Sequence, residues 1–221
     1  MRKVILSALV LSLAASAHAQ TPKTEDEKTL YAIGVLLAKQ LAVLDFSPAE
    51  LEMVRRGFVD ATSGKKVQVE PEAYQQQINR LAQGRRKLVA EKEKEKSKAF
   101  LEAAAKEKGA QQTPTGLIYV PIKEGTGPQP KENETVKVQY TGKFIDGRVF
   151  DSSLKRGQPA ELTLNSNQII KCWAEGIAKM KVGGKAKLIC PSSTAYGEEG
   201  TPIIPGGATL VFDVELLGVK K

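Results

Sequence analysis

The sequence predicts an α+β protein, in which an antiparallel sheet wraps one short helix and is preceded by an all-α domain and a long helical stalk. Three observations favour this class. Apolar residues in the first half recur at helical spacing, the composition changes after Gly109, and short β-type runs then alternate with Gly, Pro, Asp and Asn. We therefore expect a signal peptide over 1–19, a helical domain over 20–70, a long connecting helix over 71–110 and a sheet domain over 111–221.

The first residues have the three regions of a secretory signal peptide. Arg2 and Lys3 supply the positive start, an apolar run follows from Val4 to Ala15, and small residues lead to Ala19. The apolar run is too short for a transmembrane anchor, and no cysteine lies near the cut to carry a lipid. We predict cleavage after Ala19 and an exported protein without a membrane anchor.

Cleavage would remove His18, the only histidine in the chain. A mature chain without histidine excludes Ser-His-Asp and Cys-His catalysis as usually built. Its two cysteines are too few for an ordinary zinc site, so we expect no metal and no cofactor. The net charge of +8 would suggest a nucleic acid in an intracellular protein, but export argues against that partner.

The N-terminal region predicts two short helices. The first carries a stripe of apolar residues, namely Leu30, Ile33, Leu37, Leu41 and Leu44. Ser47 to Glu50 forms a capping box with Pro48 at the first helical position, and Gly64 ends the second helix. Its stripe consists of Leu51, Val54, Phe58 and Ala61. Two such helices cannot bury both stripes against each other, so we expect an all-α dimerisation domain and a homodimer. The alternative is docking onto the chain's own C-terminal half.

A third helix is expected from Pro71 through Ala104, despite Gly84. The residues from Ala90 to Ala99 are mostly charged and offer no apolar stripe, but they are strong helix formers with Glu-to-Lys pairs such as Glu91 and Lys94. This pattern predicts a solvated helical stalk. A disordered charged linker is the alternative.

After Gly116 the pattern indicates an antiparallel sheet. The expected strands are Leu117–Val120, the alternating run around Val136–Thr141, Arg148–Phe150 after the Asp146-Gly147 turn, Leu162–Leu164, Lys185–Cys190 and Ala208–Val219. Between the fourth and fifth, Trp173, Ile177 and Met180 lie on one face of a short helix that Gly183 and Gly184 stop. Trp173 is either a core anchor or the floor of an apolar pocket.

Several ordered motifs occupy this half of the chain. They are Val-Gln-Tyr-Thr-Gly (138–142), Asp-Gly-Arg-Val-Phe-Asp-Ser-Ser (146–153), Ile-Ile-Lys-Cys-Trp-Ala-Glu-Gly (169–176), Ala-Tyr-Gly (195–197), Ile-Pro (204–205) and Ala-Thr-Leu-Val-Phe-Asp-Val-Glu-Leu-Leu (208–217). Together they resemble the FK506-binding-protein (FKBP) family of peptidyl-prolyl cis-trans isomerases, from Gly116 to Val219. The helical front resembles periplasmic members of the macrophage infectivity potentiator type, which implies a periplasmic homodimer.

The resemblance implies a site for proline-containing or unfolded polypeptides. Catalytic positions would be Tyr140, Phe150, Asp151, Trp173, Tyr196 and Phe212. Substrate-binding positions would be Arg156 at the rim together with Ile169, Ile170 and Ile204. The backbone N–H of Ile170 and the hydroxyl of Tyr196 would bind substrate carbonyls, and macrolides of the FK506 or rapamycin type are implied ligands.

Such residues suit the reaction, since rotation about a peptide bond costs about 18–20 kcal/mol in lost amide resonance and needs no nucleophile. The twisted amide is less polar than the planar one, so a dry pocket favours it. The alternative function is a dimeric periplasmic holdase chaperone whose isomerase activity is incidental.

Some positions depart from the family pattern. Ala160 stands where many members carry an aromatic residue, and Thr201 stands where many carry histidine. Cys172 replaces a glycine that is usual before the tryptophan, and Cys190 ends a strand. In an oxidising compartment a Cys172–Cys190 disulfide is expected, and two buried thiols are the alternative.

Overall fold

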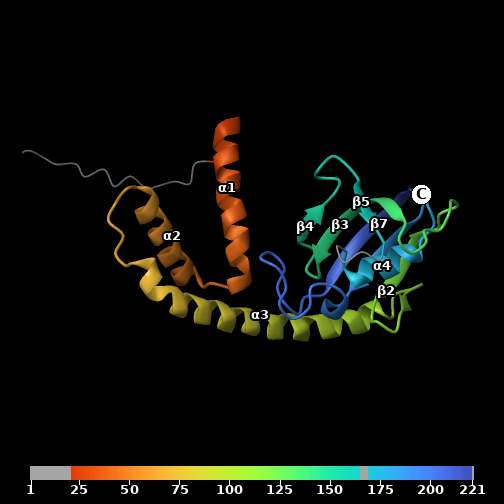
Figure 1. The fold of residues 1–221 in the computed structure, drawn as a ribbon. Helices are drawn as coiled ribbons and strands as arrows, with labels where there is room; N and C mark the ends of the chain where they lie inside the picture. Colours follow the sequence, from red (N-terminus) through yellow and green to blue (C-terminus); the bar gives the residue numbers. More distant parts are fainter. Residues whose placement is uncertain (1–20, 165–168, 221) are drawn as a thin grey trace, which may run out of the picture. The chain divides into compact units, whose positions relative to one another are not determined.

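The structure is a computed structural model that describes residues 21–164 and 169–220 (Figure 1). The expected signal peptide, residues 1–19, lies outside the described residues. The chain divides into two compact units, residues 1–37 and 38–221. Among the described residues, no helix combines the length and the apolar character needed to cross a bilayer.

The N-terminal helices form where the sequence predicts them. Helix α1 spans Glu25–Leu41, a short 3-10 turn η1 spans Ala42–Leu44, and α2 spans Pro48–Thr62. The capping box is confirmed, because Ser47 accepts a hydrogen bond from the backbone N–H of Glu50 while the Glu50 side chain accepts from Ser47. The apolar stripes are not buried within the described chain, as the 68% exposed Leu30 and the 57% exposed Phe58 show.

The third helical segment is continuous. A 3-10 turn η2 spans Pro71–Tyr74, and α3 runs from Gln75 to Ala104 without a break at Gly84. The structure thus has the helix rather than the disordered linker. Arg85 binds the Glu50 carboxylate, and Lys92 binds Asp45 at 2.9 Å, so these ion pairs join α3 to the first turn of α2 and to the residue that follows η1.

The remaining chain forms one antiparallel sheet of seven strands in the order β1-β2-β6-β7-β3-β4, with β5 paired to β3. Its strands are β1 Gln111–Gln112, β2 Ile118–Lys123, β3 Thr135–Phe144, β4 Val149–Ser152, β5 Ala160–Thr163, β6 Lys185–Cys190 and β7 Leu210–Lys220. A 3-10 turn η3 spans Ser192–Thr194. The expected strands are confirmed, and β1 lies before Gly116, where no strand is expected from the sequence.

Helix α4, Lys171–Ala178, packs on one face of this sheet. Gly176 permits close approach, because a Cβ atom there would lie 2.7 Å from both methyl groups of Leu188 on β6. The helix is shorter than expected. Met180 is buried just beyond its end, where its N–H donates to the Ile177 carbonyl in the following turn.

The opposite face of the sheet is covered by the end of α3. Ala104 joins a buried cluster with Ile118, Val120 and Ile189, and the side chains of Phe100 and Leu101 pack against this cluster. The sheet therefore lies between α4 on one side and the last turns of α3 on the other.

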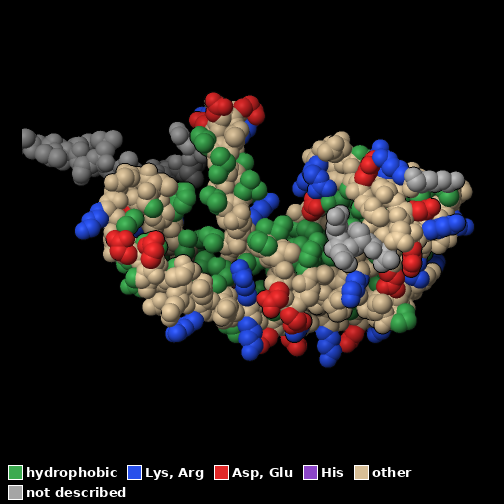
Figure 2. Space-filling model, in the orientation of Figure 1, with side chains coloured by type: hydrophobic (Ala, Val, Ile, Leu, Met, Phe, Trp, Pro, Cys, Tyr) green, Lys and Arg blue, Asp and Glu red, His purple; other side chains and the backbone are tan. Residues whose placement is uncertain are grey.

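The expectation of a wholly solvated stalk is wrong for one side of α3. Ala90, Ser97 and Ala104 recur every seven residues and are buried. The Ser97 hydroxyl accepts from the Thr209 N–H at 3.1 Å and donates to the Gly207 carbonyl at 3.4 Å. This narrow face consists of small residues, while Figure 2 shows several charged side chains along the outer side of the helix. Small residues give no apolar signal, which is why the sequence pattern missed it.

Candidate active site

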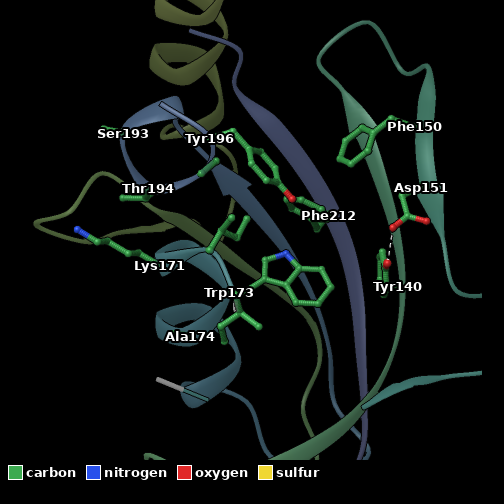
Figure 3. A pocket seen from close by; sticks show the side chains of 13 residues that line it. Tyr140, Phe150, Asp151, Lys171, Trp173, Ala174, Ser193, Thr194, Tyr196 and Phe212 are labelled. Carbon is green, nitrogen blue, oxygen red and sulfur yellow. Dashed lines mark hydrogen bonds between the residues drawn. The ribbon is translucent and has the colours of Figure 1, made fainter. Parts of the chain in front are cut away.

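A cavity of about 650 Å³ opens where β3, β4, β7, the start of α4 and the segment after η3 meet (Figure 3). It contains most of the predicted site residues: Tyr140, Phe150, Asp151, Ile169, Ile170, Trp173, Tyr196 and Phe212. These residues come from strands and loops far apart in the sequence, so the fold brings together what the motifs only suggested.

The cavity is built on aromatic rings in edge-to-face contact. Trp173 is only 7% exposed, and its ring centroid lies 4.8 Å from that of Tyr140 and 5.1 Å from that of Phe212. The ring planes cross at 82° and 85°. Phe150 meets Phe212 at 5.7 Å and 86°. Such pairs hold each ring in place. The floor of the cavity, formed by Trp173, and one wall, formed by Phe150 and Phe212, are therefore apolar and fixed.

The N-terminus of α4 places Trp173 at this floor. Ile170 is the N-cap in an extended conformation, and its carbonyl accepts the N–H groups of Trp173 at 3.0 Å and Ala174 at 3.3 Å. The indole therefore leaves the first turn of the helix. Its Nε1 atom is buried and has no hydrogen-bond partner among the described residues. Trp173 is both a core residue and part of the cavity lining, so the two roles that the sequence offers are compatible.

Gly142 on β3 makes room for the wall of the cavity. A Cβ atom at this position would lie 2.7 Å from Phe150 Cζ and 2.9 Å from Phe212 Cε1. Gly142 pairs with Asp151 on β4 and with Phe212 on β7. The sequence shows this glycine within a motif, but the need for it follows only from the paired strands.

The carboxylate of Asp151 is held by three donors. It accepts from the Tyr140 hydroxyl, from Arg156 Nη1 and from the Ser152 N–H at 2.7 Å. Arg156 Nη2 in turn donates to the Tyr140 hydroxyl at 2.7 Å. Burial, and then the hydrogen bond to Asp151, raise the pKa of Tyr140, while the bond to Tyr140 raises the pKa of Arg156. The phenol therefore keeps its proton and the guanidinium its charge.

Tyr196 supplies a second phenol from the far wall. Figure 3 shows its ring reaching across the cavity above Trp173, with the hydroxyl pointing inward. Burial raises the pKa of Tyr196, and the negative charge of Asp151 raises it further. The hydroxyl remains a hydrogen-bond donor at neutral pH.

The remaining predicted positions lie beside the cavity. Arg156 does not line it, but its bonds to Asp151 and Tyr140 place it at the rim. Ile204 is a core residue that is 4% exposed, and it borders a separate small cavity with Val43 and Val89. The structure therefore does not place Ile204 in the lining.

The cavity also has lining residues that the sequence reasoning did not name: Lys171, Ala174, Ser193, Thr194 and Ala195. A signal was present, since Lys171 and Ala174 flank Trp173 in the first turn of α4 and the other residues directly precede Tyr196. The complete arrangement is a cavity walled by aromatic rings, with neutral phenols and a carboxylate that is paired with Arg156. Such a site can bind a short apolar segment and hold its carbonyls without moving a proton.

Comparisons with known proteins agree with this geometry. Residues 127–217 match the family model described as FKBP-type peptidyl-prolyl cis-trans isomerase, and residues 26–120 match the model of the domain amino terminal to it. The FKBP-type peptidyl-prolyl cis-trans isomerase FkpA of Aeromonas hydrophila is 38% identical over 94% of this chain and 82% of its own length. The peptidyl-prolyl cis-trans isomerase Mip of Coxiella burnetii is 37% identical over all of both chains.

Solved structures show the same likeness. The crystal structure of FkpA from Escherichia coli superposes with a TM-score of 0.66 at 36% identity, covering 90% of this chain and 99% of the other. A peptidyl-prolyl isomerase from Pseudomonas syringae gives a TM-score of 0.55 at 32% identity over 59% of this chain and 96% of the other. The chain therefore belongs to the FKBP family and is a peptidyl-prolyl cis-trans isomerase, an enzyme that accelerates rotation about the bond preceding proline.

Proposed function

We propose that the X-Pro bond rotates in the 650 Å³ cavity, with the proline ring on the indole of Trp173 and between Phe150 and Phe212. The observation that carries this proposal is the convergence of these rings in fixed edge-to-face contacts. Desolvation in such a slot disfavours the planar, more polar amide relative to the twisted one, which lowers the barrier of about 18–20 kcal/mol.

Two donors would hold the substrate in the turn that leads to the twisted amide. We infer that these are the Ile170 N–H, at the N-terminus of α4, and the Tyr196 hydroxyl on the opposite wall. A donor on each side fixes two carbonyls of the bound segment and leaves the peptide bond between them free to rotate. Ile169 and Ile170 add apolar surface beside the proline ring.

Asp151 has a structural and electrostatic role in this proposal. Its oxygens already bind Tyr140, Arg156 and the Ser152 N–H, so the carboxylate orients the Tyr140 phenol and the rim guanidinium. In the Asp151–Arg156 pair the two side chains are 39% and 46% exposed, so the pair contributes little to stability. Its effect would instead be seen in how substrates are held.

Substitutions in the cavity test these roles. Phe150→Ala and Asp151→Asn should each lower kcat/KM for proline peptides. Asp213→Asn is a matched control for the second change, because Asp213 also forms a half-exposed ion pair, with Lys143 at 2.6 Å, on β7. Normal isomerase activity of both cavity variants would show that the rotation takes place elsewhere.

We propose that the chain is exported to the periplasm after removal of residues 1–19. The order of charged, apolar and small residues supports this. The mass of the protein purified from a periplasmic extract would test it, since a chain that still begins at Met1 would contradict cleavage after Ala19.

We propose a homodimer in which the helical domain of residues 20–70 packs against its copy. The exposed apolar stripes of α1 and α2 support it, because they leave large side chains such as Leu30 and Phe58 in water. Ile33→Glu should dissociate the dimer in light-scattering measurements. Ala32→Glu is the matched control, since it adds the same charge one residue away and off the stripe. An unchanged mass for Ile33→Glu would place the interface elsewhere.

The holdase alternative shares the same substrates, namely unfolded and proline-containing polypeptides. An aggregation-suppression assay on the dissociated Ile33→Glu variant and on Phe150→Ala separates the two functions. Isomerase activity should depend on the cavity and holdase activity on the helical domain.

Macrolides of the FK506 or rapamycin type are proposed ligands of the same cavity, testable by their inhibition of the isomerase reaction. Residues 71–110 and 111–221 are proposed as the connecting helix and the isomerase domain.

A further inference from the structure

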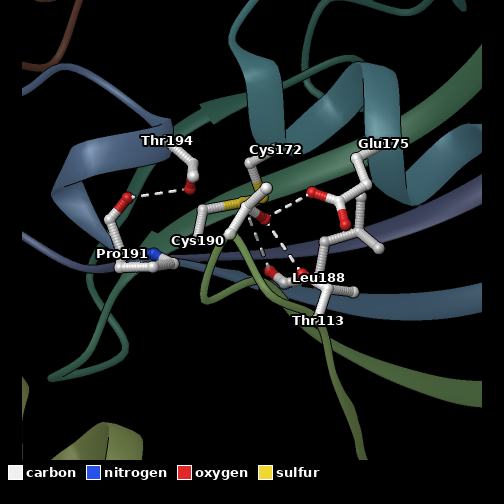
Figure 4. The surroundings of a disulfide bond; sticks show 8 residues. Thr113, Cys172, Glu175, Leu188, Cys190, Pro191 and Thr194 are labelled. Atoms are coloured by element: carbon white, nitrogen blue, oxygen red, sulfur yellow. Dashed lines mark hydrogen bonds between the residues drawn. A yellow bond between two sulfur atoms is a disulfide. The ribbon is translucent and has the colours of Figure 1, made fainter.

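The two cysteines lie at the junction of the segments that form the cavity. Cys172 is in the first turn of α4, and Cys190 is the last residue of β6. A disulfide joins them, with Cα atoms 5.7 Å apart, and both residues are 0% exposed (Figure 4). This separation is typical of disulfide-bonded residues.

Each cysteine is directly coupled to one side of the cavity. Cys172 lies between Ile170 and Trp173, which line the floor. Cys190 leads through Pro191 into η3 and on to Tyr196, which lines the opposite wall. The bond therefore spans from the floor to the far wall.

The segment between Cys190 and Tyr196 is locked by its own hydrogen bonds. Both the N–H and the hydroxyl of Thr194 donate to the Pro191 carbonyl, at 3.0 and 3.1 Å. The Gly197 N–H donates to the Ser192 carbonyl at 2.8 Å. A shift of Cys190 would therefore carry Tyr196 with it.

The disulfide is the covalent tie between the floor and the far wall, beside the packing of Gly176 on Leu188 that also holds α4 against β6. Within residues 169–178 and 190–197 of the described chain, no hydrogen bond joins the first turn of α4 to the segment after β6. The Glu175 side chain binds Thr115 at 2.5 Å, which anchors α4 to the turn before β2 instead.

We propose that Cys172–Cys190 is a positioning disulfide, which sets the spacing between the Ile170 N–H and the Tyr196 hydroxyl. This inference rests on the proposed function of these two donors. Planar substrate can bind on Trp173 alone, but the twisted amide needs both donors at once. Loss of the bond should therefore lower kcat more than it raises KM.

The test compares wild type with Cys172→Ala/Cys190→Val, which removes the bond while keeping the core filled. In an isomerisation assay we expect kcat to fall about tenfold with KM within about twofold, since small misplacements carry large rate costs. Trp173 is the only tryptophan, so its emission reports the floor directly, and we expect the spectrum to change.

Val120→Ala is the matched control for stability. Val120 lies in the cluster under α3 on the other face of the sheet, so its truncation weakens the fold without touching either segment. It should leave kcat and the Trp173 emission unchanged under conditions where the protein is folded. Unchanged kcat in the folded cysteine variant would overturn the proposal, as would equal changes in the control.

A second variant keeps the bond and loosens the wall. Pro191→Gly removes the fixed φ of −61° between Cys190 and Tyr196, and we expect the same loss of kcat in smaller degree. Full activity of Pro191→Gly would count against the proposal even if the cysteine variant did not fold. Tyr196→Phe separates the two levels of inference. If Tyr196→Phe is fully active, the proposed donor and the positioning role of the disulfide both fall. If Tyr196→Phe is impaired while the folded cysteine and proline variants are fully active, only the positioning role of the disulfide falls.

Discussion

Gly142→Ala is a sharp test of the site, because one methyl group would disturb both aromatic walls. Its Cβ would lie 2.7 Å from Phe150 Cζ and 2.9 Å from Phe212 Cε1. Ordinary carbon contacts are about 3.5–4.0 Å, so the rings must retreat by roughly 1 Å. Phe212 is buried while Phe150 is half-buried, so Phe150 should move most. Overpacking of this kind costs about 1–3 kcal/mol of stability.

The effect on activity should exceed the effect on stability. A displacement near 1 Å can cost up to about 100-fold in rate, so we expect kcat/KM to fall by at least about tenfold while the protein remains folded. A protease-free isomerisation assay and urea denaturation measure the two quantities on the same sample.

Gly147→Ala is the matched control for Gly142→Ala. Gly147 has a φ of +86°, and a Cβ added there would have no heavy atom within 4 Å, so alanine should cost about 1–2 kcal/mol through backbone strain alone. Its kcat/KM should be unchanged. If Gly142→Ala keeps kcat/KM within about twofold of wild type, Phe150 and Phe212 are not the walls of the active site.

The surroundings of the site lead to three more predictions. The raised pKa values of Tyr140 and Tyr196 mean that the folded state favours the protonated phenols, so their contribution to stability is complete below about pH 10 and is lost as pH rises through the folded pKa. A pH–rate profile should show constant kcat/KM from about pH 7 to 9, and a fall with a midpoint inside that range would contradict it. Ser97→Ala leaves the buried N–H of Thr209 unpaired and should cost about 1–3 kcal/mol in urea denaturation. Ala104→Asp places a charge in the cluster between α3 and the sheet and should cost about 3–5 kcal/mol of stability. An unchanged melting temperature would show that the end of α3 is not packed in this cluster.

Local chemistry explains what the sequence could predict. The Ser47 capping box and the Asp146-Gly147 turn depend on residues within a few positions of each other, and both are where the sequence indicates. The alternation along β3 likewise reports a sheet with unequal faces. Most residues of the cavity could also be predicted, because they lie within short contiguous motifs. The fold then brings these motifs together.

Features that depend on partners distant in the chain could not be predicted. The need for a glycine at 142 comes from Phe212 on a paired strand. The Ser97 hydroxyl accepts a hydrogen bond from the backbone N–H of Thr209, which lies more than a hundred positions further along the chain. Ile204 instead borders a small cavity together with Val43 and Val89, which lie more than a hundred positions away in the chain. No local pattern encodes these relations.

Because α3 is continuous, the number of residues between two of its contacts fixes the angle between them around the helix axis. A helix of 30 residues is about 45 Å long, and each residue advances it by about 100°. The contacts of Arg85 with Glu50 and of Lys92 with Asp45 therefore keep a fixed angular relation to the contact of Ser97 with the sheet domain. Inserting one residue between Lys92 and Ser97 would swing one set of contacts by about 100° relative to the other. Seven inserted residues would restore the relation to within about 20°, so changes in the length of this helix are tolerable chiefly in steps of two turns.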